Sequence, residues 1–260
     1  MVLIINADDF GLDERTNRAI LQSFKKGLCS STTLMPNMPG FKEACQLSHE
    51  HKLLEHVGMH LVLRDGYPLT EKIKNFPRFC NQQGQLCFSP NAFFIPLENS
   101  EKRALSEEIR AQIRRCREYG IALTHLDAHH SLHTIWAVAS VLIPIARQEK
   151  ILYLRIIGNS DLYLMPLRFK IYTHIFNYRL KVGGLARTRY LGSIKDFLAL
   201  KKRLGSFKAI GSFEISLHPR INDKQMLVDM IFDKEIDLET EVKQIDTYKD
   251  IISFSGAKYL

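Results

Sequence analysis

Two adjacent carboxylates, Asp8 and Asp9, are the first residues of the chain that could carry chemistry. They follow a short apolar run at 2–5, rich in β-branched residues, which predicts a buried strand. A carboxylate at the end of a buried strand is costly to desolvate unless a metal or a hydrogen-bond network compensates. Neighbouring residues on a strand point to opposite faces, so the two acids can take different roles. The alternative is an Asx turn that only ends the strand.

A second polar cluster, at 124–133, contains four of the ten histidines of the chain. They are His125, His129, His130 and His133, with Asp127 between them. Histidine is the commonest transition-metal ligand, and neutral imidazole suits zinc and its neighbours. A single histidine in a strand is more often packed or exposed without a function. Four histidines beside one strand end favour a metal-binding or acid–base role instead.

Two further histidines, His60 and His218, lie close to the ends of other apolar strands. In a parallel α/β fold the carboxyl ends of the strands converge on one face, which should bring them near Asp8, Asp9 and His125. One carboxylate and two histidines leave open positions on a metal for water and substrate. A second carboxylate can take the water proton, and another histidine can protonate the leaving group. The sequence has no nucleophile elbow and no Walker A loop, so metal-assisted hydrolysis is the class it predicts best.

Strands and helices alternate along the chain. The expected strands lie at 2–5, 30–35, 57–63, 121–126, 151–157 and 213–217, and the expected helices at 16–26, 41–48, 100–119, 134–147, 193–204 and 238–251. The irregular segment 64–99 fits either a substrate-binding lid or a surface excursion, and residues 160–192 have no assignable pattern. The alternation predicts parallel strands with helical crossovers, hence an α/β barrel or an open sheet in one domain, 1–260.

The length of 260 residues, with 45% hydrophobic and 25% charged residues, fits such a domain. No apolar run is long enough to span a membrane, and the N-terminus lacks the basic region of a secretory signal. The five cysteines are scattered, odd in number and without a CxxC pair. They favour reduced thiols and a cytoplasmic location.

The net charge of +8 has its source late in the chain, where 168–208 contains eleven lysines and arginines against Asp196 alone. Such a stretch could bind phosphate or an anionic membrane surface, or form a solvated basic face. It has no RNP, zinc-finger or basic-zipper signature. We therefore expect no nucleic-acid partner, although a nucleic-acid or lipid-surface binding protein remains the alternative from another functional class.

Four separate motifs resemble the YdjC/ChbG family of carbohydrate deacetylases. They are NADDFG at 6–11, VGMHL at 57–61 with GYPL at 66–69, THLDAHH at 124–130, and LHP at 217–219. The resemblance implies a distorted (β/α) barrel similar to the polysaccharide deacetylases. It also implies removal of acetyl groups from N-acetylated sugars with a divalent metal, and a related branch acts in hopanoid side-chain processing. The variable basic segment at about 160–210 has no counterpart in these motifs.

The resemblance assigns the polar residues to roles. Asp9, His60 and His125 are expected to bind one divalent metal ion, zinc or magnesium. Asp8 is expected to be the general base that activates water, and His218 the general acid for the departing amine. The expected substrate is an N-acetylated sugar or glycolipid, and a homodimer is left open.

Four further residues support these roles by resemblance. Arg155 is similar to the arginine that orients the base in related deacetylases. Asp127, His129 and His130 are expected behind the metal ligands or facing the substrate. The family often has a third consecutive histidine where this chain has Ser131, which leaves the exact substrate open. Hydrolysis of a phosphoester is the enzymatic alternative, but phosphoesterases often use two metals with more carboxylates.

Overall fold

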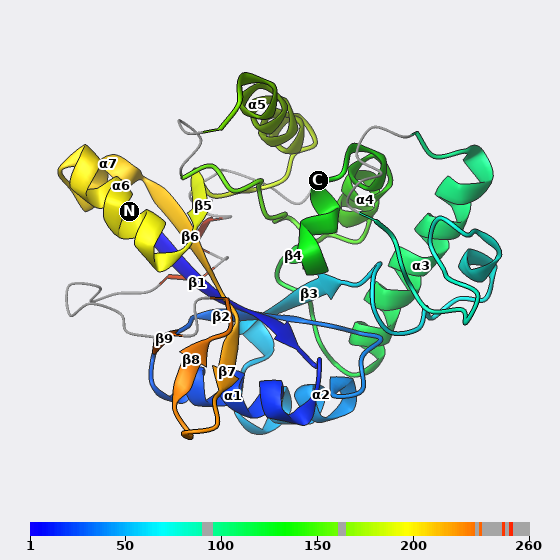
Figure 1. Ribbon diagram of the computed structural model, residues 1–260, viewed down its shortest axis with the longest axis horizontal. Coiled ribbons are helices and arrows are strands. Elements are labelled where there is room, and N and C mark those ends of the chain that lie inside the picture. Colours follow the sequence, from blue (N-terminus) through cyan, green and yellow to red (C-terminus); the bar gives the residue numbers. More distant parts are fainter. Residues whose placement is uncertain (90–95, 161–164, 232–233, 236–245, 248–249, 252–260) are drawn as a thin grey trace.

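A six-stranded parallel sheet, in the order β4-β3-β2-β1-β6-β5, forms the centre of the computed structural model (Figure 1). The structure describes residues 1–89, 96–160, 165–231, 234–235, 246–247 and 250–251. The strands are β1 (Val2–Phe10), β2 (Ser31–Leu34), β3 (Val57–Leu61), β4 (Leu126–Ala128), β5 (Tyr190–Gly192) and β6 (Ser212–Leu217). A small antiparallel sheet follows, made of β7 (Pro219–Ile221), β8 (Leu227–Asp229) and β9 (Lys234–Glu235).

The parallel sheet curls into a half-barrel, which confirms the predicted distorted-barrel fold in a single α/β domain. Beyond β4, isolated parallel bridges join Leu126 to Leu154 and Tyr153 to Ala186. The chain then leads from Ala186 to β5 at the opposite edge of the sheet. The predicted strand at 151–157 is therefore reduced to two bridging residues.

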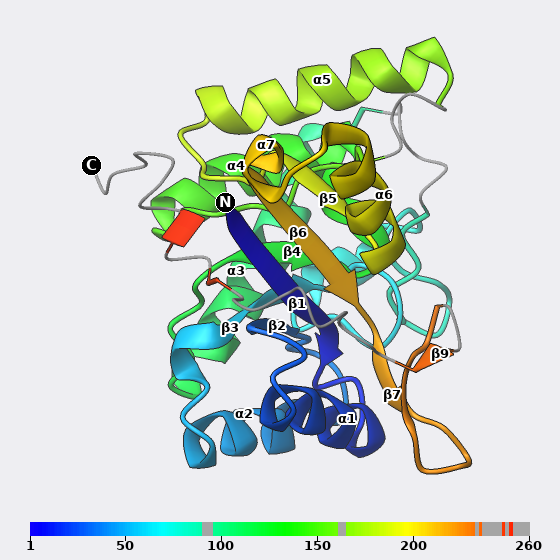
Figure 2. The same ribbon diagram turned by 90° about the vertical axis from the view of Figure 1, so that its left-hand side faces the viewer.

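Helices connect the strands and flank the sheet (Figures 1 and 2). They are α1 (Glu14–Lys25), α2 (Phe41–Glu50), α3 (Asn99–Glu118), α4 (Trp136–Gln148), α5 (Leu167–Val182), α6 (Ile194–Leu204) and α7 (Phe207–Ile210), with short 3-10 helices η1 (Leu54–His56), η2 (Lys72–Asn75) and η4 (His129–Thr134). None of the helices in the described residues has both the length and the apolar character needed to cross a bilayer. The helix predicted at 238–251 falls mostly outside the described residues.

The two faces of β1 show how the sequence builds the barrel. Leu3, Ile5 and Ala7 belong to the main apolar core, which also contains Ala19 and Ile20 of α1. The alternate residues point to the barrel interior, where Ile4 belongs to a small second core with Tyr153. Further along the strand, that inner face becomes polar. The sheet thus separates an apolar helix-facing side from a polar interior near the strand ends.

The segment after β3 is folded onto the protein through its own apolar side chains. Ile73, Phe79, Leu86 and Phe88 are buried, and Phe79 stacks on Phe88 with ring centroids 5.3 Å apart. Residues 90–95 of the predicted irregular segment lie outside the described residues. These side chains join the main apolar core of the domain, and the first residues of the segment approach the histidine cluster described below.

Candidate metal centre and active site

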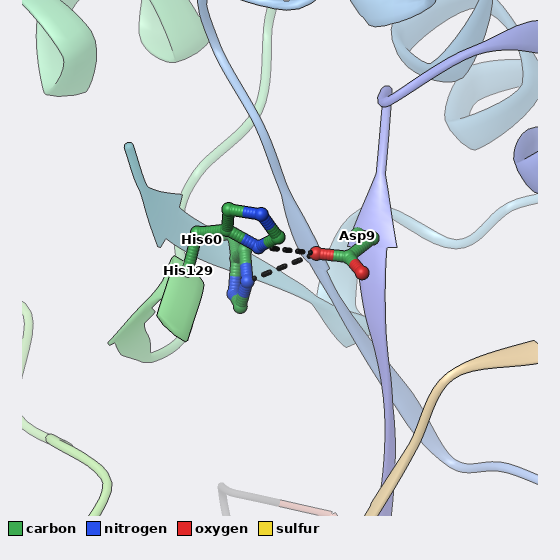
Figure 3. Close-up of side chains that lie close together, drawn as sticks. All are labelled: Asp9, His60 and His129. Atoms are coloured by element: carbon green, nitrogen blue, oxygen red, sulfur yellow. Dashed lines mark ion pairs between the residues drawn. The ribbon is translucent and has the colours of Figure 1, made fainter. Parts of the chain in front are cut away.

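Asp9, His60 and His129 come together at the carboxyl ends of three chain segments (Figure 3). His60 Nε2 lies 3.2 Å and His129 Nδ1 2.9 Å from the same oxygen, Asp9 Oδ1. Asp9 is the next-to-last residue of β1, His60 belongs to β3, and His129 begins η4 directly after β4. Their potential ligand atoms all lie within 4.8 Å of one another. This cluster has the donor set of one carboxylate and two imidazoles that the sequence predicted, but with a different second histidine.

A local irregularity of β1 turns Asp9 toward this cluster. Regular alternation would point Asp9 the same way as Ala7, toward the helices. The register between β1 and β2 shifts between Ala7 and Phe10, and Asp9 has the left-handed backbone angle φ 70°. A bulge of this kind redirects a side chain, and strained backbone is common at functional sites. Both neighbouring acids can therefore face the barrel mouth.

The electrostatics of Asp9 fit a cation. Burial alone would raise its pKa, but the imidazoles of His129 and His60 outweigh burial and hold the pKa well below the usual range. Among the described residues its buried Oδ1 has no hydrogen-bond partner, although both imidazoles are close. A buried anionic oxygen requires compensation. One carboxylate with two imidazoles is a set that zinc and similar divalent ions accept.

Asp127 holds the other side of His60. Its Oδ1 lies 2.6 Å from His60 Nδ1, and Thr33 Oγ1 lies 3.2 Å from the same nitrogen. Burial lowers the pKa of His60, but the carboxylates of Asp127 and then Asp9 outweigh burial and raise the pKa to about 10. A carboxylate behind a histidine ligand fixes the ring and strengthens its donor nitrogen. Asp127, which sequence analysis placed behind the ligands or facing the substrate, lies behind His60.

The structure does not bring His125, the third predicted ligand, to this cluster. His125 is fully buried; its Nε2 lies 3.1 Å from Asn6 Oδ1 and its Nδ1 2.7 Å from Thr124 Oγ1. Its ring packs on the backbone of β3 at Gly58, where an added Cβ would come within 2.6 Å of the ring. Burial lowers its pKa well below the usual range. His125 therefore lies beneath the cluster and has a structural role there.

Strand alternation explains the exchange of His125 for His129. Residues 125, 127 and 129 are two apart, so their side chains point to the same face of the extended chain. The register pairs His60 with Asp127, which puts His125 one layer deeper and His129 one layer nearer the mouth. β4 begins at Leu126 and ends at Ala128, later than the predicted strand at 121–126. The sequence prediction thus chose the histidine at the wrong end of the strand for contact with Asp9.

Arg155 joins three buried carboxylates behind the mouth of the barrel. Its Nη1 and Nη2 lie 2.7 and 2.8 Å from the two oxygens of Asp8. Nη1 also lies 2.6 Å from Asp127 Oδ2, and Nε donates to Glu214 Oε1 at 2.5 Å. Tyr153 donates its hydroxyl to the other oxygen of Glu214. This network connects Asp8 to the residue that holds His60.

His218 approaches Asp8 from the other side of β1. It follows β6, and its Nε2 lies 3.7 Å from Asp8 Oδ2. Its backbone N–H donates to Asp229 Oδ2 at 3.0 Å, while its Nδ1 is buried without a hydrogen-bond partner among the described residues. In the sheet order, β6 adjoins β1 on the side opposite β2 and β3. Asp8 is therefore flanked by the histidine cluster on one side and His218 on the other.

Residues 2–248 match the family model described as YdjC-like protein. The chain belongs to the YdjC-like family. A carbohydrate deacetylase of Clostridium beijerinckii is 29% identical over 99% of this chain and 96% of its own length. One of Brevibacillus brevis is 28% identical over 93% and 90%. The crystal structure of a putative cellobiose-phosphate cleavage protein from Enterococcus faecalis has the same fold, with a TM-score of 0.70 at 23% identity, covering 99% of this chain and 96% of that one.

In this member of the YdjC-like family, a second polar group lies at the edge of the site. Asp65 Oδ2 is 3.3 Å from His130 Nε2 and 3.6 Å from His129 Nε2. His130 and Ser131 both adopt left-handed backbone angles, φ 53° and 55°, so the chain turns sharply there. Asp65 and His130 are exposed, which puts them where a substrate could reach them.

Sequence reasoning missed three residues of this YdjC-like site: Asp65, Tyr153 and Glu214. Asp65 stands in a segment that showed no regular pattern, and Tyr153 stands in an apolar run that indicated only a buried strand. Glu214 gave the one usable signal, because it alternates with apolar residues on β6 and shares the inward face with Ser216. A buried charge on that face requires a partner.

Proposed function

We propose that the protein is a metal-dependent hydrolase that removes the acetyl group from an N-acetylated sugar or glycolipid. The observation that carries the proposal is the position of Asp8, between a three-residue donor cluster and His218. The relatives named carbohydrate deacetylase support the acetylated carbohydrate as the substrate class. The five free cysteines support a cytoplasmic location.

Asp9, His60 and His129 would hold one divalent ion, zinc or magnesium. When bound, such an ion would lower the pKa of a water molecule and polarise the acetyl carbonyl. Asp127 keeps the His60 ring in place by accepting a hydrogen bond from its Nδ1–H, so that the unprotonated Nε2 can bind the metal. This revised set replaces the predicted His125 with His129 and keeps the number and types of donors.

Asp8 would accept the proton of the attacking water. Burial would raise its pKa, but Arg155 outweighs burial and holds the pKa well below the usual range, so the carboxylate stays ionised. The pairing with Arg155 also makes Asp8 a weak base, which suffices only for an acidified water. His218 would donate a proton to the departing amine nitrogen, because an amine leaves poorly unless it is protonated.

Released acetate measured across a panel of N-acetylated sugars, oligosaccharides and glycolipids tests this proposal. The protein should be stripped of metal, then reconstituted separately with zinc and with magnesium. Activity that depends on metal and on an N-acetyl group supports the proposal. Hydrolysis of a phosphoester in place of the amide, or full amide hydrolysis by the stripped protein, would contradict it.

A further inference from the structure

Helix α5 has two apolar faces, and only one of them packs on the protein. Thr173, Phe176 and Leu180 are buried, and the Tyr172 hydroxyl anchors the helix by donating to the carbonyl of Thr134 at 2.6 Å. A surface helix normally needs one apolar face to pack on its domain. The second apolar face of α5 therefore has no role in the core.

That second face is a continuous stripe of exposed apolar side chains. Its members follow one another at intervals of three or four residues and are 49–71% exposed: Leu167, Ile171, Ile175, Tyr178 and Val182. Residues at this spacing lie along one line of a helix. Figure 2 shows α5 lengthwise along the upper edge of the molecule. We call this line of side chains the α5 stripe.

Basic residues border the α5 stripe on both sides. At 100° per residue, Arg168 lies along one edge of the stripe, and Lys170 and Lys181 along the other. Arg179 follows Arg168 on the same edge, but its guanidinium lies over the Trp136 ring, 4.2 Å from the centroid, and is not counted among the outward cations. Within Leu167–Val182 there is no aspartate or glutamate. An apolar line flanked by cations is the arrangement of helices that lie in the plane of an anionic membrane surface.

The charges beside the α5 stripe distinguish between the partners that could cover it. A second copy of the chain, packed through the same face by twofold symmetry, would bring the cations of one α5 against those of the other, and the helix itself has no acid to pair with them. A nucleic acid would place its phosphates over the apolar centre of the stripe, while binding to phosphates requires cations. An anionic bilayer matches both parts, because its headgroups neutralise the flanks while its acyl boundary accepts the stripe.

We propose that α5 docks the protein on an anionic lipid surface. The helix would lie in the plane of the interface, with the α5 stripe entering the headgroup region and its basic borders contacting lipid phosphates. This proposal rests on α5 alone and does not depend on the reaction proposed above. It gives a role to part of the basic segment that the catalytic residues do not use.

Co-sedimentation with vesicles of phosphatidylcholine, with and without phosphatidylglycerol, tests the proposal on the full chain. Binding should require phosphatidylglycerol and should weaken with added salt. The double variant Ile171→Ser/Ile175→Ser should lose most binding. Arg168→Glu/Lys181→Glu should lose at least about fivefold for each cation removed, since one membrane-facing cation contributes roughly that factor.

Two matched double variants serve as controls on exposed positions elsewhere: Met226→Ser/Met230→Ser for the apolar change and Lys102→Glu/Arg103→Glu for the charge change. Both should bind vesicles like the unaltered chain, and circular dichroism should show all variants folded. Equal binding by the α5 variants and the controls would overturn the proposal. A dimer that dissociates in Ile171→Ser/Ile175→Ser, or binding to duplex DNA without binding to vesicles, would also overturn it.

Discussion

Arg155 binds Asp8 through both terminal nitrogens, at 2.7 Å from one carboxylate oxygen and 2.8 Å from the other. A bidentate pair of this kind fixes the plane of the carboxylate as well as its charge. Asn6 Nδ2 and Ser216 Oγ add hydrogen bonds to the same group, at 2.7 and 3.0 Å. Asp8 is therefore held in one orientation before any substrate arrives.

Replacing Asp8 with asparagine should leave metal binding intact and remove most turnover. The amide has nearly the same shape as the carboxylate, but it cannot accept the water proton. General-base contributions run to roughly 10²–10⁴-fold, and kcat should fall by that order. Acetate release and metal content measured on the same preparation check this. Near-normal turnover with bound metal would exclude Asp8 as the base.

His60→Ala and His129→Ala should each lose bound metal along with activity, because each removes an imidazole that contacts Asp9. His125→Gln is the matched control, since His125 contacts Asn6 and Thr124 instead. This control should lower the melting temperature and keep the metal. Elemental analysis of the three folded variants decides the ligand set. Metal lost from His125→Gln and kept by His129→Ala would restore the ligand set predicted from sequence.

Metal binding should release protons and strengthen as pH rises. The Asp127 and Asp9 carboxylates raise the pKa of His60 to about 10 despite its burial, so the metal-free ring is protonated at neutral pH. A ligand histidine must be neutral, and the cation therefore competes with this proton until pH passes the raised pKa. Calorimetric titration in buffers of different ionisation enthalpy counts the protons. We expect about one proton from His60 per metal ion, and zero release would contradict the role of His60.

The general position of the site could be predicted from the sequence, because the site lies where the carboxyl ends of parallel strands meet. Asp8, His60 and His218 each lie at or near the end of an apolar run, and parallel strands bring those ends together. The choice between His125 and His129 could not be predicted, because both share one face and only the register of β3 with β4 decides between them. The left-handed turn at Asp9 was hidden for a similar reason, since strand alternation alone points this side chain away.

Helix α5 shows a different limit of sequence reading. Its segment was unassignable because apolar residues occur on two faces, Phe176 and Leu180 inward and Ile171 and Ile175 outward. Predicting a helix from the periodicity of its apolar residues requires one apolar face and one polar face. The contact of Arg155 with Asp8 agrees with the role that the family resemblance assigned to this arginine, but the contacts of Arg155 with Asp127 and Glu214 could not be read from the sequence. Asp127 lies 28 positions before Arg155 (155 − 127) and Glu214 lies 59 positions after it (214 − 155), so no local pattern links them.

Glu214→Gln should lower kcat and leave the KM for the sugar nearly unchanged. Glu214 contacts Arg155 and Tyr153 inside the barrel and has no exposed surface. Its loss should loosen the hold of Arg155 on Asp8, and partners of this kind typically contribute 10- to 100-fold, or about that order. Glu108→Gln is the control, because Glu108 is equally buried but accepts hydrogen bonds from the backbone at Leu69. The control should lower stability without a comparable fall in kcat, and equal falls in both would deny Glu214 a positioning role.

The position of His218 allows the chemistry of the leaving group to be tested separately from metal binding. His218 follows β6, beyond β1 from the proposed metal ligands, and its ring nitrogen Nε2 is 3.7 Å from Asp8 Oδ2. Its backbone N–H bond to Asp229 does not depend on the side chain. Replacement by alanine should therefore preserve the turn and leave the proposed ligands untouched.

His218→Ala should keep its metal and lose N-acetyl hydrolysis by roughly 10²–10⁴-fold, the usual contribution of a general acid. An activated ester such as p-nitrophenyl acetate should suffer much less, because its leaving group departs without a proton. The hydrolysis rates of the amide and of the ester, and the metal content, should be measured on one preparation so that the two losses can be compared. An equal loss on amide and ester would remove His218 from the acid role, since protonation of the leaving group would no longer explain the defect. Unchanged rates on both would leave His218 as part of a His-Pro turn, with its side chain outside the reaction.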